Sequence, residues 1–142
     1  MDVILTQTDT TVGFLSQNET RLQDIKSRKN EKPFIKVYTN LKNFKKDKNR
    51  VPKTQKSRVR RAQKTTFIVK NFAFRVAQHR LSSMLLNAKW SYSTSANEAS
   101  KKFNREFCEE KTDIIIENKE LLCEGAPSSL LKINTKKIRK LR

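Results

Sequence analysis

Residues 90–100 read WSYSTSANEAS, a stretch in which an alternating segment leads into a cluster of small hydrogen-bonding side chains. The alternation over residues 91–93 is typical of the end of a β-strand. Residues 95–98 have the Ser-x-x-Glu spacing of a capping box, in which the Ser oxygen accepts a backbone N–H bond and the Glu side chain reaches back. We therefore predict a strand that is followed by a helix beginning near Asn97.

Two interpretations of this strand-to-helix junction remain open. In the first, Ser95 and Asn97 only cap the helix, as such residues commonly do. In the second, a phosphate or carboxylate binds where the unpaired N–H groups and the positive dipole end of the helix converge. Ser93, Ser95 and Asn97 would then point at that anion.

Length and composition indicate a single compact domain that covers residues 1–142. A chain of 142 residues and 16.6 kDa buries about two-thirds of the surface that its unfolded form exposes. Its two cysteines, Cys108 and Cys123, fit neither a zinc site nor a secreted disulfide framework, so we expect free thiols and no protein-bound metal. We find no basic leader and no apolar run of roughly 18 residues. We expect a cytoplasmic protein with no membrane partner.

The formal net charge is +18 and the isoelectric point is about 10.3, which indicates a polyanionic partner such as RNA. The alternative is that abundant Lys reflects a biased genome, with the charges on solvated faces. Residues 42–64 contain eleven Lys or Arg and one acid, so this basic segment contributes +10. We predict a solvated loop or weak helix within the domain that contacts RNA phosphates. The candidate RNA-binding residues are Lys53, Lys56, Arg58, Arg60 and Arg61.

The remaining pattern alternates short strands with helices, which indicates the α/β class. Strands are expected at residues 3–8, 34–38, 65–70, 72–76, 113–117 and 136–142, with the first and the fifth of these buried. The segment of residues 8–14 should continue the first strand into a turn at Gly13. Helices are expected after residues 16–19, near residues 79–85, and from Asn97, where Phe103 and Phe107 should pack inward.

Five segments, in order along the chain, resemble the signatures of the YrdC-like family, the bacterial threonylcarbamoyl-AMP synthases that supply threonylcarbamoyladenosine in tRNA. Residues 93–97 resemble the family's Ser-Thr-Ser-Ala-Asn, and residues 8–13 resemble its Pro-Thr-Asp-Thr-x-x-Gly with Gln7 in place of the proline. Residues 26–28 resemble its Lys-x-Arg-Pro, with Lys29 in place of that proline.

The other two segments lie on either side of the central stretch. Residues 74–79 resemble a family strand with a Val-Arg motif, and residues 125–132 resemble the family's Pro-Ser-Thr-x-x-Asp. Where the family has Trp-Pro-Gly-Pro-x-Thr, residues 61–66 keep only Thr66. This loss of two prolines and a glycine is the largest departure from the family pattern.

The resemblance implies the YrdC-like α/β fold, a twisted mixed sheet with helices around it. It also implies a nucleotidyltransferase that joins L-threonine, bicarbonate and ATP into threonylcarbamoyl-AMP, releases pyrophosphate, and binds RNA on a basic face. Mg²⁺ would arrive with the ATP. Other proteins of the tRNA-modification machinery would be partners.

Residue roles follow from the same resemblance. Lys26 and Arg28 would be catalytic, because an ammonium and a guanidinium held close together can bind phosphate and carboxylate oxygens at once. Thr8 and Arg28 would bind threonine, and Thr66 and Arg75 would lie at the cleft. The nucleotide-binding residues would be Lys26, Ser93, Ser95, Asn97 and Ser128.

Two other functions fit the same residues. The first is a noncatalytic module that binds double-stranded RNA or tRNA on this fold, because the chain is so basic and has lost Pro-Gly-Pro. The second is association with the ribosome, for which basicity is the only support. The two glycines of the chain cannot form a Gly-rich phosphate loop, so side chains and helix ends must bind any phosphate.

Overall fold

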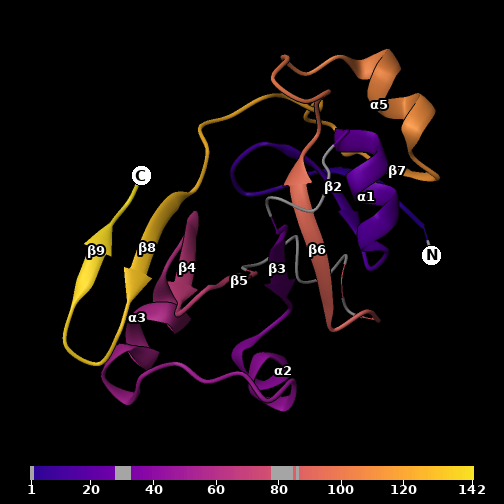
Figure 1. Ribbon diagram of the computed structural model, residues 1–142. Coiled ribbons are helices and arrows are strands. Elements are labelled where there is room, and N and C mark those ends of the chain that lie inside the picture. Colours follow the sequence, from indigo (N-terminus) through magenta and orange to yellow (C-terminus); the bar gives the residue numbers. More distant parts are fainter. Residues whose placement is uncertain (1, 28–32, 78–84, 86) are drawn as a thin grey trace. The chain divides into compact units, whose positions relative to one another are not determined.

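The structure is a computed structural model that describes residues 2–27, 33–77, 85 and 87–142 (Figure 1). The chain divides into two compact units, each built from two separate stretches of sequence. Unit 1 comprises Met1–Phe34 and Ser91–Ala126, and unit 2 comprises Ile35–Trp90 and Pro127–Arg142. Each unit has its own hydrophobic core and its own mixed set of strands.

Unit 1 contains four paired strands in the order β7-β1-β2-β6. These strands are β1 (Ile4–Gln7), β2 (Val12–Ser16), β6 (Trp90–Ser95) and β7 (Ile114–Ile116). β2 pairs antiparallel with both β1 and β6, whereas β7 runs parallel to β1. The register places Leu15 opposite Ser93, so the Ser-Thr-Ser segment is a strand paired with β2.

Two helices belong to unit 1, α1 (Glu19–Lys26) and α5 (Arg105–Lys111), both visible in Figure 1. Each begins after an Asn whose side chain accepts a backbone N–H bond, Asn18 for α1 and Asn104 for α5. The buried core joins side chains from these strands and helices: Val3, Leu5, Val12, Phe14, Leu22, Ile25, Phe34, Ala96, Cys108 and Leu122. The helix expected after residues 16–19 is therefore confirmed, and its residues Leu22 and Ile25 are buried.

Unit 2 contains five paired strands in the order β3-β5-β4-β8-β9. They are β3 (Ile35–Tyr38), β4 (Thr65–Val69), β5 (Phe72–Val76), β8 (Ser129–Ile133) and β9 (Ile138–Lys140). β3 with β5 and β4 with β8 are parallel pairs, whereas β4 with β5 and β8 with β9 are antiparallel. The predicted mixed α/β fold class is confirmed by the strands and helices of both units.

The basic segment of residues 42–64 is more ordered than we predicted. It forms most of α2 (Leu41–Lys46), the 3-10 turn η1 (Lys53–Gln55) and α3 (Lys56–Arg61). Of the two expectations, the helix is confirmed by α2 and α3, whereas the solvated loop is wrong because Phe44, Val51 and Val59 are buried in the core of unit 2. The ring of Phe44 lies 4.3 Å from that of Phe74, centroid to centroid, and anchors α2 on the strands.

The helix that we expected near Asn97 does not form there, and α5 begins eight residues later at Arg105. Glu98 makes an ion pair with Lys101 at 2.8 Å, and the Ser95 hydroxyl donates to the side-chain oxygen of Asn97 at 2.8 Å. The backbone of Ser100 is left-handed, with φ of 63°, which ends the turn. The capping box and the helix end are therefore both wrong for residues 95–98, whereas anion binding by Ser93, Ser95 and Asn97 stays a prediction.

Three smaller predictions are also settled by the structure. The turn after β1 lies at Thr8–Thr11, and Gly13 lies within β2. The strand β7 is exposed along most of its length, not buried. Phe103 precedes α5, although it packs inward with Phe107 as expected.

None of the helices that the structure describes combines the length and the apolarity that crossing a membrane requires. Both cysteines are free thiols, as predicted. Burial in the core of unit 1 raises the pKa of the Cys108 thiol. This side chain is therefore suited to packing and is a poor nucleophile.

Candidate functional site

The hydroxyl of Thr8 closes the turn that joins β1 to β2. Thr8 Oγ1 donates to the main-chain oxygen of Thr11 at 2.6 Å and accepts the backbone N–H groups of Thr10 and Thr11, each at 3.2 Å. The hydroxyls of Thr8 and Thr10 lie 3.2 Å apart. The residue predicted to bind threonine thus also holds together a loop rich in hydroxyl groups.

Both glycines of the chain lie against this turn. A Cβ atom on Gly13 would come within 3.1 Å of Thr8 Cγ2 and 3.1 Å of the main-chain oxygen of Thr94. A Cβ atom on Gly125 would come within 1.9 Å of the main-chain oxygen of Thr10. Neither glycine has a positive φ. Each position requires glycine because another backbone segment lies too close for a Cβ atom.

Lys26, the last residue of α1, is bound by the segment that follows β6. The side chain is almost completely buried, and its Nζ donates to the main-chain oxygens of Ser95 at 3.0 Å and Asn97 at 2.8 Å. It also donates to Asn97 Oδ1 at 2.5 Å. These three acceptors are uncharged carbonyl oxygens, which take up donor hydrogens of the Lys26 side chain.

Three of the predicted segments therefore come together in unit 1. The Thr8 turn lies beside β6 through Gly13, and the end of β6 binds Lys26. Arg28 lies outside the described residues, as does His79. The structure thus brings together Thr8, Lys26, Ser93, Ser95 and Asn97, five of the residues that the sequence singled out.

The other predicted site residues lie in unit 2. The hydroxyls of Thr66 and Ser128 are 2.7 Å apart, and both side chains are buried. Arg142 donates from Nε to the main-chain oxygen of Ser128 at 3.0 Å. Arg75 is buried on β5, which agrees with a constrained position for its guanidinium.

Sequence reasoning assigned no role to Gly125 or Arg142. For Gly125 a signal was present, because it is one of only two glycines and precedes a segment that resembles the family. Arg142 gave no signal, since it is one basic residue among many at the end of a basic chain.

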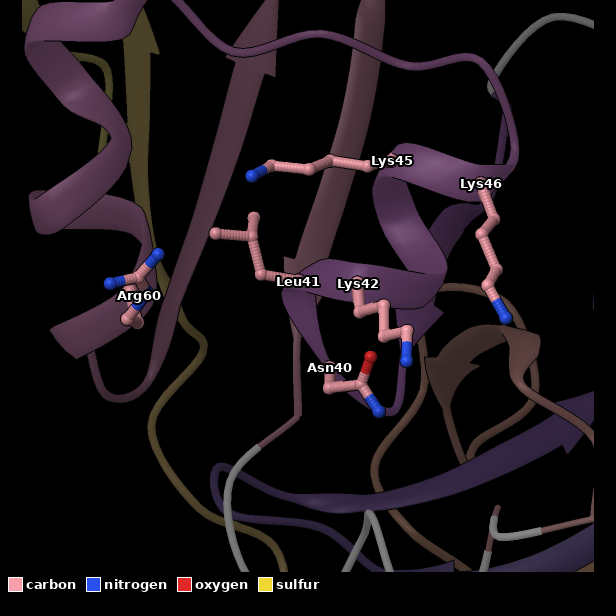
Figure 2. A pocket seen from close by; sticks show the side chains of 6 residues that line it. All are labelled: Asn40, Leu41, Lys42, Lys45, Lys46 and Arg60. Carbon is pink, nitrogen blue, oxygen red and sulfur yellow. The ribbon is translucent and has the colours of Figure 1, made fainter.

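A basic hollow of about 670 Å³ lies on α2 and α3 in unit 2. Its lining residues are Asn40, Leu41, Lys42, Lys45, Lys46 and Arg60. Figure 2 shows Leu41 and Lys45 extending from α2 toward the side on which Arg60 lies, whereas Lys42 and Lys46 point downward in that view. The predicted RNA-binding residue Arg60 thus shares a hollow with three lysines that the prediction did not name.

A second hollow of about 370 Å³ shares Leu41 and Lys45 with the first. Its lining residues are Leu41, Phe44, Lys45, Asn49, Arg50, Val51 and Lys56. Lys53, Arg58 and Arg61, also predicted to bind RNA, are exposed on η1 and α3 but line neither hollow.

Asp47 is the one acid of the basic segment, and it faces β3. Its Oδ2 accepts from Lys36 Nζ at 2.7 Å and from the Tyr38 hydroxyl at 2.6 Å. The hydrogen bond from Lys36, then that from Tyr38, lowers the pKa of the Asp47 carboxyl. Asp47 is therefore engaged in holding α2 on β3.

No group of three or more His, Cys, Asp or Glu side chains within the described parts of the chain is arranged to hold a metal ion. The candidate sites are instead built from hydroxyl, amide and cationic groups. Such groups bind phosphates and carboxylates.

No protein-family model matches the chain, and no curated protein matches its sequence. Solved structures do match: Sua5 of P. abyssi complexed with L-threonine shows a TM-score of 0.72 at 16% identity, over 99% of this chain and 50% of Sua5. YciO of E. coli shows a TM-score of 0.73 at 15% identity, over 99% of this chain and 82% of YciO.

Full-length HypF in its phosphate- and nucleotide-bound form also matches, with a TM-score of 0.75 at 15% identity, over 99% of this chain and 22% of HypF. The chain thus spans about half of Sua5 and about a fifth of HypF. The chain is an α/β protein that pairs its strands both parallel and antiparallel. Its fold is the YrdC-like fold shared by Sua5, YciO and HypF.

Proposed function

We propose that this chain is an L-threonylcarbamoyladenylate synthase-like protein of tRNA modification that uses L-threonine, bicarbonate and ATP. One observation carries the proposal, namely the convergence of Thr8, Lys26 and the segment of residues 93–97 in unit 1. These residues are far apart in the sequence and were chosen for their resemblance to one family. Sua5, with the same fold, has been solved with L-threonine bound.

The chemistry joins two substrates and releases pyrophosphate. The amine of threonine forms a C–N bond to the carbon of bicarbonate with loss of water, which gives a carbamate, and one carbamate oxygen attacks the α-phosphorus of ATP. The new P–O bond forms as the bond to pyrophosphate breaks, so the protein must align the two groups and stabilise the leaving charge. HypF, with the same fold, has been solved with phosphate and nucleotide bound, which supports a nucleotide site.

Lys26 is suited to this task because its side-chain nitrogen is buried and donates to oxygens at the end of β6. The oxygens of Ser95 and Asn97 orient it, and an incoming phosphate near these residues would meet positive charge in a site partly shielded from water. Arg28 would bind the threonine carboxylate together with Thr8. Ser93 would add a further contact to the nucleotide, and Mg²⁺ would enter with ATP.

A second candidate is a noncatalytic module that binds double-stranded RNA or tRNA on the same fold. The observation in its favour is the pair of basic hollows on α2 and α3. The loss of Pro-Gly-Pro near Thr66 also agrees with a member of the fold that no longer turns over.

The deciding experiment measures pyrophosphate release by the purified protein with ATP and bicarbonate, with and without L-threonine. We expect release that depends on threonine and is lost in Arg28→Ala. The matched control is Arg139→Ala, which removes one guanidinium from the exposed strand β9. Full activity in Arg28→Ala would contradict the assigned role of Arg28.

A folded protein that releases no pyrophosphate would contradict the synthase. If the same preparation bound double-stranded RNA, the second candidate would then be preferred. Threonine-dependent release would instead show that residues 62–64 can replace the family's Pro-Gly-Pro.

A further inference from the structure

Two strands of the structure have a neighbour on one side only. β7 pairs with β1 and β9 pairs with β8, and neither has a second partner among the strands that the structure describes. In Figure 1, β9 is the outer yellow arrow beside β8. The open side of an edge strand presents backbone N–H and C=O groups that can pair with a strand of another chain.

Apolar side chains are exposed at both of these edge strands. Within the described residues, five large hydrophobic side chains are exposed, and four of them lie on or directly beside β7 or β9: Ile114, Ile115, Ile138 and Leu141. The fifth, Leu121, lies in the segment that follows β7. Single exposed apolar residues are ordinary on a protein surface, but these gather where backbone groups are open for pairing.

The charges around the two edges are opposite in sign. Residues 105–124, which include α5 and β7, contain seven acidic and three basic residues, a net charge of −4 in a chain of +18. Residues 129–142, which include β8 and β9, contain six basic residues and no acid. The two edges are therefore complementary in charge as well as in their open backbone groups.

The acids at the two ends of β7 are already paired within the chain. Asp113 makes an ion pair with Arg21, and Glu117 makes one with Arg105 at 2.7 Å. Charged side chains along an edge strand discourage pairing with another chain, so these ion pairs reduce the protection of β7. The other acids of residues 105–124 still outnumber the two lysines of that segment.

Charge also decides which edges can meet. Two copies of β9 side by side would place cations against cations, and two copies of the surface around β7 would bring acids against acids. Pairing β9 of one copy with β7 of another brings opposite charges together. At about 0.15 M salt the Debye length is roughly 8 Å, so these local charges outweigh the repulsion between two whole chains of +18.

We propose that β9 of one copy of this chain adds to the open edge of β7 of a second copy. The chain then associates with itself through two different surfaces, which is a heterologous contact. The exposed side chains of Ile115 and Ile138 are covered there. Because each strand has three residues, the interface is small and the association is transient. This self-association goes beyond the synthase reaction and does not depend on it.

The test uses two variants of the full chain, each blocked at one edge. Ile115→Lys places a charge on β7, and Arg139→Glu/Lys140→Glu reverses two charges on β9. Sedimentation velocity at about 0.15 M salt, from micromolar to millimolar protein, gives the oligomeric state of each variant and of the wild type.

Matched controls make the same changes of charge away from both edges. Thr20→Lys adds one cation at an exposed position of α1, and Lys45→Glu/Lys46→Glu reverses two exposed charges on α2. Circular dichroism and the urea midpoint verify that every variant is folded, so a loss of association cannot come from unfolding.

We expect the sedimentation coefficient of the wild type to rise with concentration. Each edge variant should associate with itself at least about tenfold more weakly, whereas both controls should behave as the wild type does. A mixture of the two edge variants should form a one-to-one dimer and nothing larger, because Ile115→Lys keeps an intact β9 and its partner variant keeps an intact β7.

A wild-type protein that stays monomeric up to millimolar concentration would overturn the proposal. Equal association of the edge variants and the controls would overturn it as well. Undiminished self-association of Arg139→Glu/Lys140→Glu would show that β7 pairs with β7 of another copy, which also contradicts the proposed contact. A mixture of the two edge variants that forms no dimer would exclude the pairing of β9 with β7.

Discussion

The Nζ atom of Lys26 lies 2.5 Å from the side-chain oxygen of Asn97, a residue 71 positions further along the chain. The same ammonium donates to the main-chain oxygen of Asn97 at 2.8 Å. One hydrogen-bonding group thus ties the end of α1 to the segment after β6. This contact explains why the segment around Asn97 is a turn, since its acceptors are oriented toward Lys26 and not toward a helix of its own.

Lys26→Met should destabilise the protein. Methionine fills a similar volume, but the oxygens of Ser95 and Asn97 lose a charged donor, which typically costs about 1.5–3 kcal/mol. Part of this cost is offset because a buried charge is removed. We expect the free energy of unfolding in urea to fall by about 2 kcal/mol.

The control for this measurement is Lys101→Met. Lys101 makes an exposed ion pair with Glu98, and such pairs contribute about 0–1 kcal/mol. If both variants were equally stable, the contact between Lys26 and Asn97 would not hold the turn.

The two glycines should differ sharply in their tolerance of alanine. In Gly125→Ala the new Cβ would overlap the main-chain oxygen of Thr10 at 1.9 Å, so backbone must move. In Gly13→Ala the contacts are 3.1 Å, which neighbours can relieve by small shifts. We expect Gly125→Ala to cost more than about 3 kcal/mol of unfolding free energy and Gly13→Ala about 1 kcal/mol. The reverse order of urea midpoints would show that Gly125 is not packed on the Thr8 turn.

The strands were the part of the fold most accessible from sequence. Residues 65–69 and 72–76 are rich in β-branched and aromatic side chains, and both form strands. The α1 helix was predictable because Leu22 and Ile25 share one face and both are buried. In these cases the local pattern and the tertiary environment favour the same structure.

Prediction failed where a distant contact decided the local structure. Ser95 and Glu98 have the spacing of a capping box, yet Lys26 from α1 binds this segment instead. In the basic segment, Phe44, Val51 and Val59 are buried, but apolar residues are so sparse among the cations that their burial was not visible in the sequence. The lysines that line the first basic hollow could not be separated from other lysines before α2 was placed.

Acid should weaken the contact that Asp47 makes with β3. The bonds from Lys36 and Tyr38 lower the pKa of Asp47 below its ordinary value of 3.8 in the folded protein. The folded state therefore binds the proton less tightly than the unfolded state. The stabilisation is fully present above about pH 4 and is lost as the pH falls through the lower, folded pKa.

Asp47→Asn removes this titration and supplies the comparison. Thermal unfolding at several pH values should show the wild type more stable than Asp47→Asn at pH 7. The difference should shrink below about pH 4. A difference that stays constant between pH 7 and pH 2 would mean that the charge of Asp47 contributes nothing.

Thr66 and Ser128 should behave as a coupled pair in unit 2. Their hydroxyls lie 2.7 Å apart, and both side chains are buried. Thr66→Val alone leaves Ser128 without one partner, and Ser128→Ala does the same to Thr66. Each single change should therefore cost about 1–2 kcal/mol, whereas the double variant should cost less than the sum of the two.

A double-mutant cycle from urea unfolding measures this coupling. Arg142 also donates to the Ser128 hydroxyl, at 3.4 Å, so part of the cost of Ser128→Ala should persist in the double variant. We expect a coupling free energy of about 1 kcal/mol between Thr66 and Ser128. Strict additivity would show that the two hydroxyls act independently, and the pairing of β4 with β8 would then rest on backbone bonds and apolar packing alone.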